Sequence, residues 1–128
     1  EPDIVWLCGV AEVWAPYFAV SGARGFTSGL ANVDPRRSVA LFRALKENRN
    51  ADVEELRQGV RQFEELRNLD GGRNNVSVVK EALAQLGLCR RDVRPPISPV
   101  NAADRERVAH VLTEWGLRPG PGQQAGPS

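Results

Sequence analysis

The stretch Gly22-Ala23-Arg24-Gly25-Phe26-Thr27-Ser28-Gly29-Leu30-Ala31-Asn32-Val33-Asp34-Pro35 predicts a short buried strand, a tight connection and the start of a helix. The strand covers about residues 25–28, and its glycines indicate that the backbone approaches other atoms closely there. Asp34-Pro35 is a helix-start signal, because Asp accepts from the free N–H groups of a first turn and Pro has no N–H to leave unpaired. This stretch separates two differently built parts of the chain.

The part before this stretch predicts one more strand and one more helix. Residues 4–8 (IVWLC) form an apolar run that is typical of a strand buried on both faces. Residues 12–20 predict a helix, with Pro16 in its first turn, where a missing N–H costs little, and Gly22 as its C-terminal cap. So short a crossover between two strands implies a right-handed parallel βαβ unit. The expected apolar face of this helix comprises Val13, Tyr17 and Val20, with Trp14 and Phe18 beside them.

The part after this stretch predicts helices alone. They cover residues 35–48, 51–69 and 75–88, and a last helix is capped by Asn101 with Asp104 at the reciprocal position of a capping box. The expected core residues are Val39, Phe42 and Leu45, then Val53, Leu56, Val60, Phe63 and Leu66, then Val76, Val79, Leu83 and Leu86, and finally Val108, Val111, Leu112 and Trp115. The charged residues of 51–69, Glu64 and Arg67 among them, are expected on a solvated face.

Composition bounds the class of protein. The chain has 128 residues, 41% of them hydrophobic, and a formal net charge of +1, so no electrostatic argument favours nucleic acid or an anionic membrane as a partner. No apolar run approaches the roughly 20 residues that span a bilayer, and no signal peptide is recognised, so a cytoplasmic location is expected. No metal-binding, dinucleotide or P-loop spacing is present, so no cofactor is predicted. Cys8 and Cys89 are expected to be buried free thiols.

Two parallel strands cannot pair their own outer edges, and a two-stranded parallel sheet is not a stable architecture by itself. The chain also enters its first strand almost at Glu1. We therefore expect that partner strands lie outside this chain and that it is a piece of something longer.

Several pieces of the sequence agree, in order and spacing, with one known family. They are LCG at 7–9 followed by AE at 11–12, GARGFTSG at 22–29, ANV at 31–33 before Pro35, VKEAL at 79–83 with LGL at 86–88, and RPPI at 94–97. Residues 4–117 thereby resemble the C-terminal part of the dihydrodipicolinate synthase / N-acetylneuraminate lyase family, which are class I aldolase-type barrels. The segment GFTSG at 25–29 also resembles the branch of the family that contains 5-dehydro-4-deoxyglucarate dehydratase.

This resemblance implies an α/β fold, a partial TIM (β/α)8 barrel made of the last two strands and their helices plus a C-terminal three-helix appendage. Residues 4–9 and 25–29 would be the seventh and eighth strands. The implied domains are 1–50 for the barrel units, 51–117 for the appendage and 118–128 for a disordered tail. A complete barrel needs about 250 residues, so strands one to six are expected elsewhere.

The resemblance also implies a chemistry that this chain does not complete. In the family, a lysine on the sixth strand forms an imine with the 2-oxo carbon of pyruvate or a related 2-oxo acid, and a tyrosine on the fifth strand relays protons. Both positions lie upstream of Glu1. Lys46 and Lys80 are on predicted helices rather than at strand ends, and so is Tyr17, so no catalytic residue is expected in this chain.

The expected contribution of this chain is part of a substrate-pocket rim. The rim residues are Gly9, Val10, Ala11, Thr27 and Ser28. Thr27 either offers a hydroxyl to a polyhydroxylated substrate or, like Ser28, satisfies local backbone groups. Glu12 either lines the mouth or favours a helix N-terminus. Asn32 is expected to fix a turn through its side chain, and His110 to be a structural or surface histidine.

Two functions from different classes follow. In the first, the chain is a segment of a Schiff-base-forming lyase, contributes pocket rim and assembly helices, and is inactive until an upstream barrel segment or partner chain completes it. In the second, it is a non-catalytic helical interaction or assembly module derived from such an enzyme. A homo- or hetero-oligomer is expected in either case. A third possibility is strand pairing between copies, which predicts concentration-dependent folding.

Overall fold

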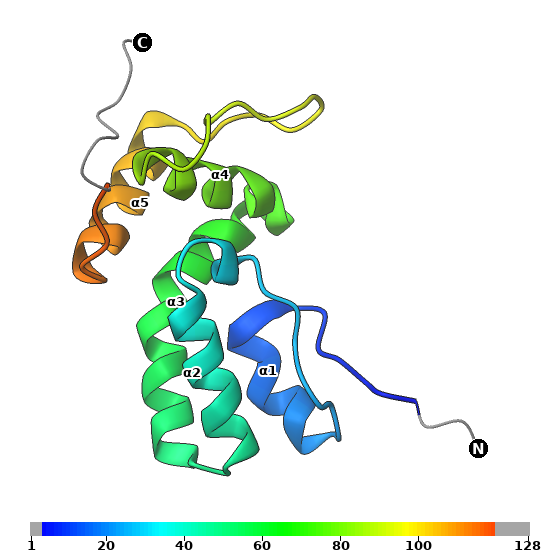
Figure 1. Cartoon of the computed structure of the whole chain (residues 1–128). Helices are drawn as coiled ribbons and strands as arrows, with labels where there is room; N and C mark the ends of the chain where they lie inside the picture. The colour runs from blue at the N-terminus through cyan, green and yellow to red at the C-terminus, as the bar shows by residue number, and fades with distance from the viewer. Residues whose placement is uncertain (1–3, 120–128) are drawn as a thin grey trace. The chain divides into compact units, whose positions relative to one another are not determined.

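The computed structural model describes residues 4–119, whose regular elements are helices (Figure 1). The chain divides into two compact units, one up to Glu64 and one from Glu65 onward, and each is described by itself. The elements are α1 (Ala11–Val20), the short 3-10 helix η1 (Leu30–Asn32), α2 (Pro35–Lys46), α3 (Asn50–Gly72), α4 (Asn75–Gln85) and α5 (Ala102–Glu114). Within the described residues, no helix combines the length and the apolar character needed to cross a membrane.

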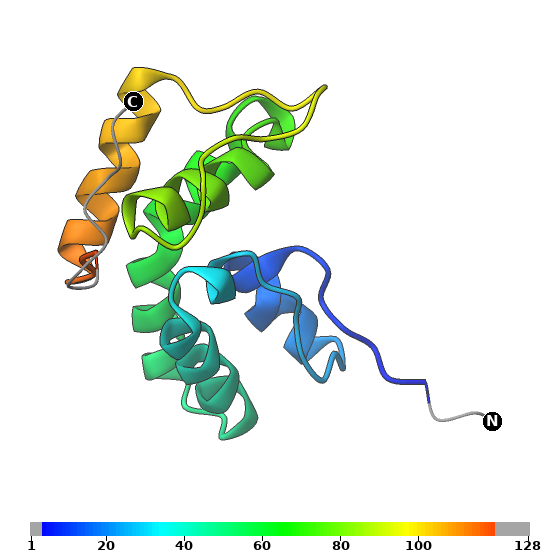
Figure 2. The same cartoon turned by 45° about the horizontal axis from the view of Figure 1, so that its top comes forward.

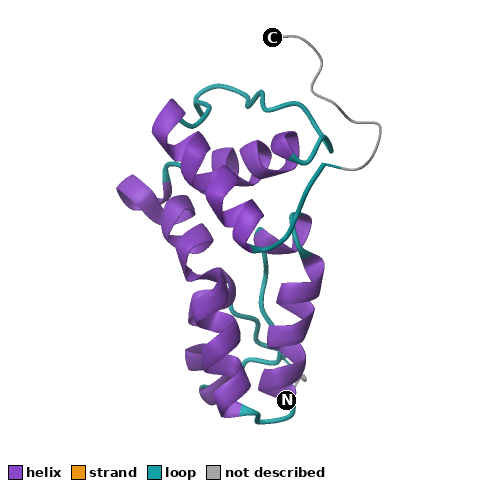
Figure 3. Cartoon of the chain, turned by 90° about the vertical axis from the view of Figure 1, so that its left-hand side faces the viewer, coloured by secondary structure: helices purple, strands orange, loops and turns teal. Residues whose placement is uncertain are grey.

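The two predicted strands are reduced to one isolated parallel bridge. Cys8 pairs with Phe26 in parallel, and no strand is present among residues 4–119 (Figure 3). The prediction of full strands at 4–9 and 25–29 was therefore wrong. The predicted parallel direction of the two segments agrees with the bridge. Two extended segments with unpaired outer edges have too few ladder hydrogen bonds to form regular strands.

The first helix buries a different face from the one predicted. Its buried residues are Ala11, Glu12 and Ala15, whereas the predicted core residues Tyr17 and Val20 are 56% and 91% exposed. The helix begins at Ala11, so Pro16 lies inside it rather than in its first turn. The missing Pro N–H therefore removes an interior helical hydrogen bond. As predicted, Gly22 follows the helix end with a left-handed φ of 97°.

The second helix and the first part of α3 form the core of the first unit. Leu41, Ala44 and Val53 are buried together, and Phe26, Leu45 and Leu56 pack against them. In both views α1 and α2 lie beside each other (Figure 1, Figure 2). Val39 is 44% exposed, so the buried stripe of α2 is rotated from the predicted face toward the side of Asp34 and Ser38.

The regular part of α3 ends close to the predicted position. Leu69, Asp70 and Gly71 have non-helical backbone angles, which fits the stop signal Asp70-Gly71-Gly72. Val53, Val60, Phe63 and Leu66 are buried as predicted. Glu64 and Arg67 are buried as well, so their assignment to a solvated face was wrong.

The second unit contains the end of α3 with α4 and α5, and α4 and α5 pack against each other. Helix α4 is three residues shorter than predicted at its C-terminal end and buries Ser77, Val78, Glu81 and Ala82. Val76, which was predicted in the core, is 48% exposed. The Ser77 hydroxyl donates to the Ser98 carbonyl at 2.6 Å and thereby ties α4 to the proline-rich connector.

Helix α5 follows the sequence prediction closely. The Asn101 side chain accepts from the Asp104 N–H at 2.8 Å, and its amide donates to the Asp104 carboxylate at 2.9 Å. Val108, Val111 and Leu112 are buried. The division into 1–50 and 51–117 stays a prediction, and most of the predicted tail lies outside the described residues.

Candidate functional site

The parallel bridge brings the two groups of predicted rim residues together. The Cys8 N–H donates to the Gly25 carbonyl, and the Thr27 N–H donates to the Cys8 carbonyl, each at 2.9 Å. The Arg24 N–H donates to the Trp6 carbonyl at 2.8 Å. Because the two segments run in the same direction, their C-terminal ends lie next to each other. Residues 9–11 and 27–28, which are distant in sequence, both start from this end.

The rim residues differ in exposure. Gly9, Val10 and Thr27 are exposed, Ser28 is half-buried, and Ala11 is buried. A Cβ added at Gly9 would meet no atom within 4 Å, so the space in front of this backbone is open in the chain. Ala11 has a left-handed φ of 62°, a conformation that is uncommon for a residue with a side chain. The chain therefore turns sharply from the first extended segment into α1.

A polar cluster joins the half-buried rim residue Ser28 to Glu12 and Ser38, which are buried. The Glu12 side chain is fully buried. Its Oε1 accepts from the Ser38 hydroxyl at 2.5 Å and also from the Ser28 hydroxyl. The two serine oxygens lie 3.1 Å apart, and Ser28 Oγ accepts from the Ala31 N–H at 2.8 Å. One carboxylate thus joins the first turn of α1, the end of the second extended segment and the first turn of α2.

The second oxygen of this carboxylate is left without a partner. Glu12 Oε2 is buried and has no hydrogen-bond partner among the described residues. Leaving a buried acceptor unpaired costs about 1–3 kcal/mol. The sequence reading placed Glu12 at a helix N-terminus or at the mouth. It does lie in the first turn of α1, and its contacts are with the hydroxyls of Ser28 and Ser38.

Sequence reasoning missed Ser38, and a signal for it was present. Asp34, Ser38 and Leu41 follow each other at helical spacing, so a stripe drawn through them places Ser38 on the buried side of α2. The prediction instead followed the larger apolar side chains at Val39 and Phe42. Glu12 is the only acidic residue among the buried side chains of α1, and a buried carboxylate needs hydrogen-bond donors such as this serine.

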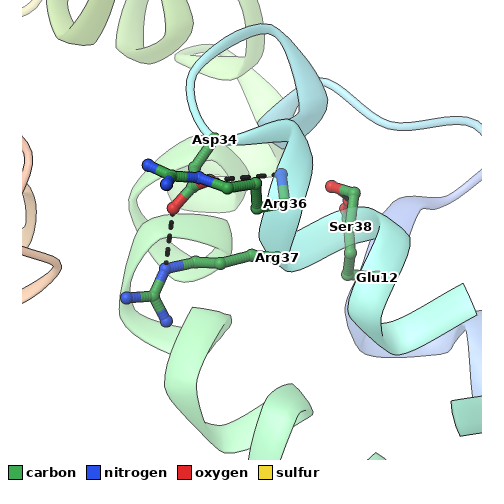
Figure 4. Close-up of polar contacts among 5 residues, drawn as sticks. All are labelled: Glu12, Asp34, Arg36, Arg37 and Ser38. Atoms are coloured by element: carbon green, nitrogen blue, oxygen red, sulfur yellow. Dashed lines mark hydrogen bonds and ion pairs between the residues drawn. The ribbon is translucent and has the colours of Figure 1, made fainter. Parts of the chain in front are cut away.

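The start of α2 is fixed by Asp34, which is also buried. Its Oδ1 accepts from the Arg36 N–H at 3.2 Å, and its Oδ2 accepts from Arg37 Nε at 3.1 Å. Figure 4 shows these contacts on one side of the helix start, with Ser38 and Glu12 on the other. This cap confirms the predicted helix start and holds Ser38 in place beneath the rim.

The geometry separates the roles of Thr27 and Ser28. Successive side chains of an extended segment point to opposite faces. Ser28 is turned toward α1 and α2 by its bonds to Glu12 and Ser38, so Thr27 belongs to the opposite face, and it is exposed. Ser28 therefore bonds to local polar groups, the Ala31 N–H among them, while a role of Thr27 toward substrate stays a prediction.

The other residues considered from the sequence are not part of this rim. Lys46 is exposed in the last turn of α2, and Lys80 is half-buried on α4. The Asn32 amide donates to the Gly29 carbonyl at 3.1 Å, as expected of a residue that fixes a turn. His110 is exposed, with Nδ1 3.6 Å from Glu114 Oε2. No cluster of three or more His, Cys, Asp or Glu residues that could hold a metal ion occurs within residues 4–119.

Comparison with known proteins gives a consistent family match. The model of the dihydrodipicolinate synthetase family matches residues 1–115. The chain is 34% identical over 111 residues to the 4-hydroxy-tetrahydrodipicolinate synthase of Geobacter metallireducens, covering 87% of this chain and 37% of that protein. It is 31% identical to a probable 5-dehydro-4-deoxyglucarate dehydratase of Bacillus licheniformis, covering 84% of this chain and 36% of that protein.

Solved structures agree with this match. The crystal structure of dihydrodipicolinate synthase from Oceanobacillus iheyensis superimposes with a TM-score of 0.85 at 40% identity, covering 91% of this chain and 39% of that one. The Bacillus clausii dihydrodipicolinate synthase structure gives 0.85 at 39% identity, covering 89% and 38%. The chain therefore spans less than two fifths of the length of each of these relatives.

Proposed function

Because the chain belongs to the dihydrodipicolinate synthetase family, we propose that it is the last part of a lyase that forms a Schiff base with pyruvate or another 2-oxo acid. In this proposal, residues 4–9 and 25–29 are the seventh and eighth strands of a (β/α)8 barrel. Helices α1 and α2 follow these strands, and the helices from residue 51 onward form a C-terminal appendage. The observation that carries the proposal is the parallel bridge between Cys8 and Phe26, with residues of both segments gathered at its C-terminal end, where barrel enzymes place their active sites.

The unpaired apolar surface of the first extended segment supports a missing neighbour. Ile4, Val5, Trp6 and Leu7 are each more than half exposed, with exposures of 64%, 55%, 68% and 57%. Side chains of this kind are normally buried, and a barrel would bury them against its other strands and its interior. The short coverage of the relatives leaves room for those strands upstream. Completion by an upstream barrel segment or partner chain, in a homo- or hetero-oligomer, is therefore part of the proposal.

The imine-forming lysine is proposed to lie outside this chain. An imine lysine must reach the substrate carbonyl from the C-terminal end of a barrel strand. Lys46 lies in the last turn of α2, and Lys80 lies within α4, so neither follows an extended segment. Tyr17 is on α1 rather than at a strand end. The chain alone is then inactive.

This chain is proposed to supply part of the rim of the substrate pocket, and its residues there set the shape and the polarity of that rim. Gly9 leaves open space for substrate, and Val10 and Ala11 carry the chain from there into α1. Thr27 presents an exposed hydroxyl on the face away from the helices, and Ser28 anchors that segment to Glu12. In this arrangement the rim selects among 2-oxo acids by the groups beyond their reacting carbonyl.

Borohydride trapping with pyruvate tests the proposal. A lysine amine condenses with the 2-oxo carbon and releases water, and hydride from borohydride reduces the imine to a stable secondary amine that adds mass to the chain. We expect no adduct on this chain alone. Mixed with the upstream lysine-bearing segment of a family member, it should restore an adduct on that segment's lysine. The control is the same upstream segment with its imine lysine replaced by arginine.

Two outcomes would contradict this proposal. An adduct on Lys46 or Lys80 of the isolated chain would place the chemistry within it. A failure to restore trapping, together with a stable helical assembly of this chain, would instead favour the non-catalytic assembly module. That second function is supported by the compact helical unit from Glu65 onward, which includes none of the rim residues.

A further inference from the structure

The first unit contains a cavity that the proposed chemistry does not use. It has a volume of about 420 Å³ and lies between the C-terminal halves of α1 and α2, the start of the second extended segment and the start of α3. None of the rim residues Gly9, Val10, Ala11, Thr27 and Ser28 lines it. The rim lies at the opposite ends of the same elements, at the N-terminal turns of α1 and α2, so the two places are separate.

Small residues of α1 and of the connection that follows it line one wall of the cavity. Ala15 and Ala19 of α1 and Ala23 and Gly25 of the connection supply almost no side-chain volume. The opposite wall is aromatic, with the rings of Phe26 and Phe42 in an edge-to-face arrangement at 6.5 Å between centroids. Its volume lies within the range of about 300–1,000 Å³ that is typical of ligand pockets, and a cavity of roughly 150 Å³ already holds benzene. A hydrocarbon body larger than one ring therefore fits.

The polar groups around the cavity have one sign of charge. Arg24 and Lys46 line it together with the amides of Asn48 and Asn50, and the described lining contains no Asp or Glu. Lys46 Nζ lies 5.6 Å from the centroid of the Phe42 ring, so its charge is held at the aromatic wall. Two cations and two amides can bind an anionic group of a ligand. A ligand with an ammonium group would find no carboxylate in the described lining to pair with.

We propose that this cavity binds a carboxylate ligand with a hydrocarbon body and no ammonium group. The hydrocarbon body packs against Phe26, Phe42 and the alanines, and the carboxylate lies between Arg24 and Lys46. Every lining residue belongs to the first unit of this chain, and ligand binding to this cavity is measured without forming an imine. A negative result for ligand binding would therefore leave the proposed lyase function untouched, and a negative result in borohydride trapping would leave the cavity proposal untouched.

Isothermal titration calorimetry of the whole protein with decanoate tests this proposal. Decanoate should bind, decyltrimethylammonium should not, and added salt should weaken the binding. Lys46→Met and Arg24→Met should each weaken it by up to about five-fold, as expected for exposed charges. The matched control is Arg43→Met, since Arg43 is an exposed cation on α2 that does not line the cavity, and it should leave the affinity unchanged.

A variant that fills the cavity shows whether decanoate binds inside it or elsewhere on the protein surface. Ala19 is half-buried on α1, and Ala19→Trp should abolish decanoate binding while the circular dichroism spectrum and thermal midpoint stay close to those of the parent. Equal binding of the anionic and cationic probes would overturn the proposal. So would unchanged binding by the folded Ala19→Trp variant, an equal loss in Arg43→Met, or no binding of decanoate at all.

Discussion

At the scale of single residues, Glu12 is the most informative side chain. Its fully buried carboxylate accepts two serine hydroxyls through one oxygen and none through the other. We expect Glu12→Ala to lower the free energy of unfolding by about 1–3 kcal/mol, because Ser28 and Ser38 lose their acceptor in a buried place. Urea unfolding followed by circular dichroism measures this change.

The matched variant is Glu12→Gln, which keeps the acceptor oxygen and removes the buried charge. It should lie within about 1 kcal/mol of the parent protein, because a neutral amide costs less to bury than an unpaired carboxylate oxygen. Glu55→Ala, at an exposed position of α3, controls for the loss of a glutamate. A loss in Glu12→Gln as large as that in Glu12→Ala would show that the acceptor oxygen alone is not sufficient and that the cluster requires the carboxylate.

The exposed hydroxyl of Thr27 is expected to contact substrate if the proposed function holds. In the enzyme completed with its upstream segment, Thr27→Val should raise KM for a hydroxylated 2-oxo acid by about two- to ten-fold, the value of one hydrogen bond. The KM for pyruvate, which has no further hydroxyl, should change little. Steady-state kinetics with both substrates checks this. An equal effect on both would assign Thr27 to backbone positioning instead of specificity.

At the scale of elements, the start of α2 depends on Asp34. Asp34→Ala removes both the cap to the Arg36 N–H and the bond from Arg37 Nε. We expect a loss of about 1–3 kcal/mol in the free energy of unfolding, from the cap together with the partly buried ion pair. Asp34→Asn keeps a capping oxygen and should lose less. Glu55→Ala, at an exposed position of α3, is the control in the same urea titration.

On α3, the side chains of Glu54 and Arg57 interact across one turn. Hydrogen bonds from Arg57, and then from Gln58, hold the pKa of the Glu54 carboxyl below its usual value. A lowered pKa in the folded state adds stability above the unfolded-state pKa, and this is lost as the pH falls through the folded-state pKa. Arg57→Gln should therefore raise the pKa of Glu54, as measured by NMR titration of its side-chain carboxyl.

The comparison variant for this pair is Arg61→Gln. Arg61 lowers the pKa of Glu54 only through a charge interaction that is the smallest of the contributions, so this variant should raise that pKa less than Arg57→Gln does. An unchanged pKa in Arg57→Gln would mean that the helix geometry, and not the arginine contact, sets the value.

At the scale of the whole molecule, the extended segments have free edges. Hydrogen exchange measured by mass spectrometry should show rapid exchange for residues 4–7 in the isolated chain, and slower exchange for α2 and the first part of α3. Addition of the upstream barrel segment should protect residues 4–7, because new strands would pair their edges. Strong protection of these residues in the dilute isolated chain would contradict the proposed completion.

The sequence by itself determined the caps, the helix order and the pairing direction. Asp34 and Asn101 cap helices as their residue types predict, and Gly22 and the Asp70-Gly71-Gly72 run end helices where expected. These features depend on neighbours within a few residues, so local chemistry is sufficient to predict them. The motif order was also sufficient to identify the family, because short pieces at matching spacing preserve its pattern.

Only the tertiary structure decided which faces are buried. In α1 the largest apolar side chains, Trp14 and Tyr17, are exposed, and the small residues Ala11 and Ala15 with Glu12 are buried. Periodicity locates an apolar stripe but not the surface that covers it, and Trp14, Tyr17 and Val20 each stay more than half exposed in the described chain. The Glu12 cluster and the cavity near Phe42 likewise join residues that are distant in sequence. Their geometry depends on how whole elements pack, which no local pattern encodes.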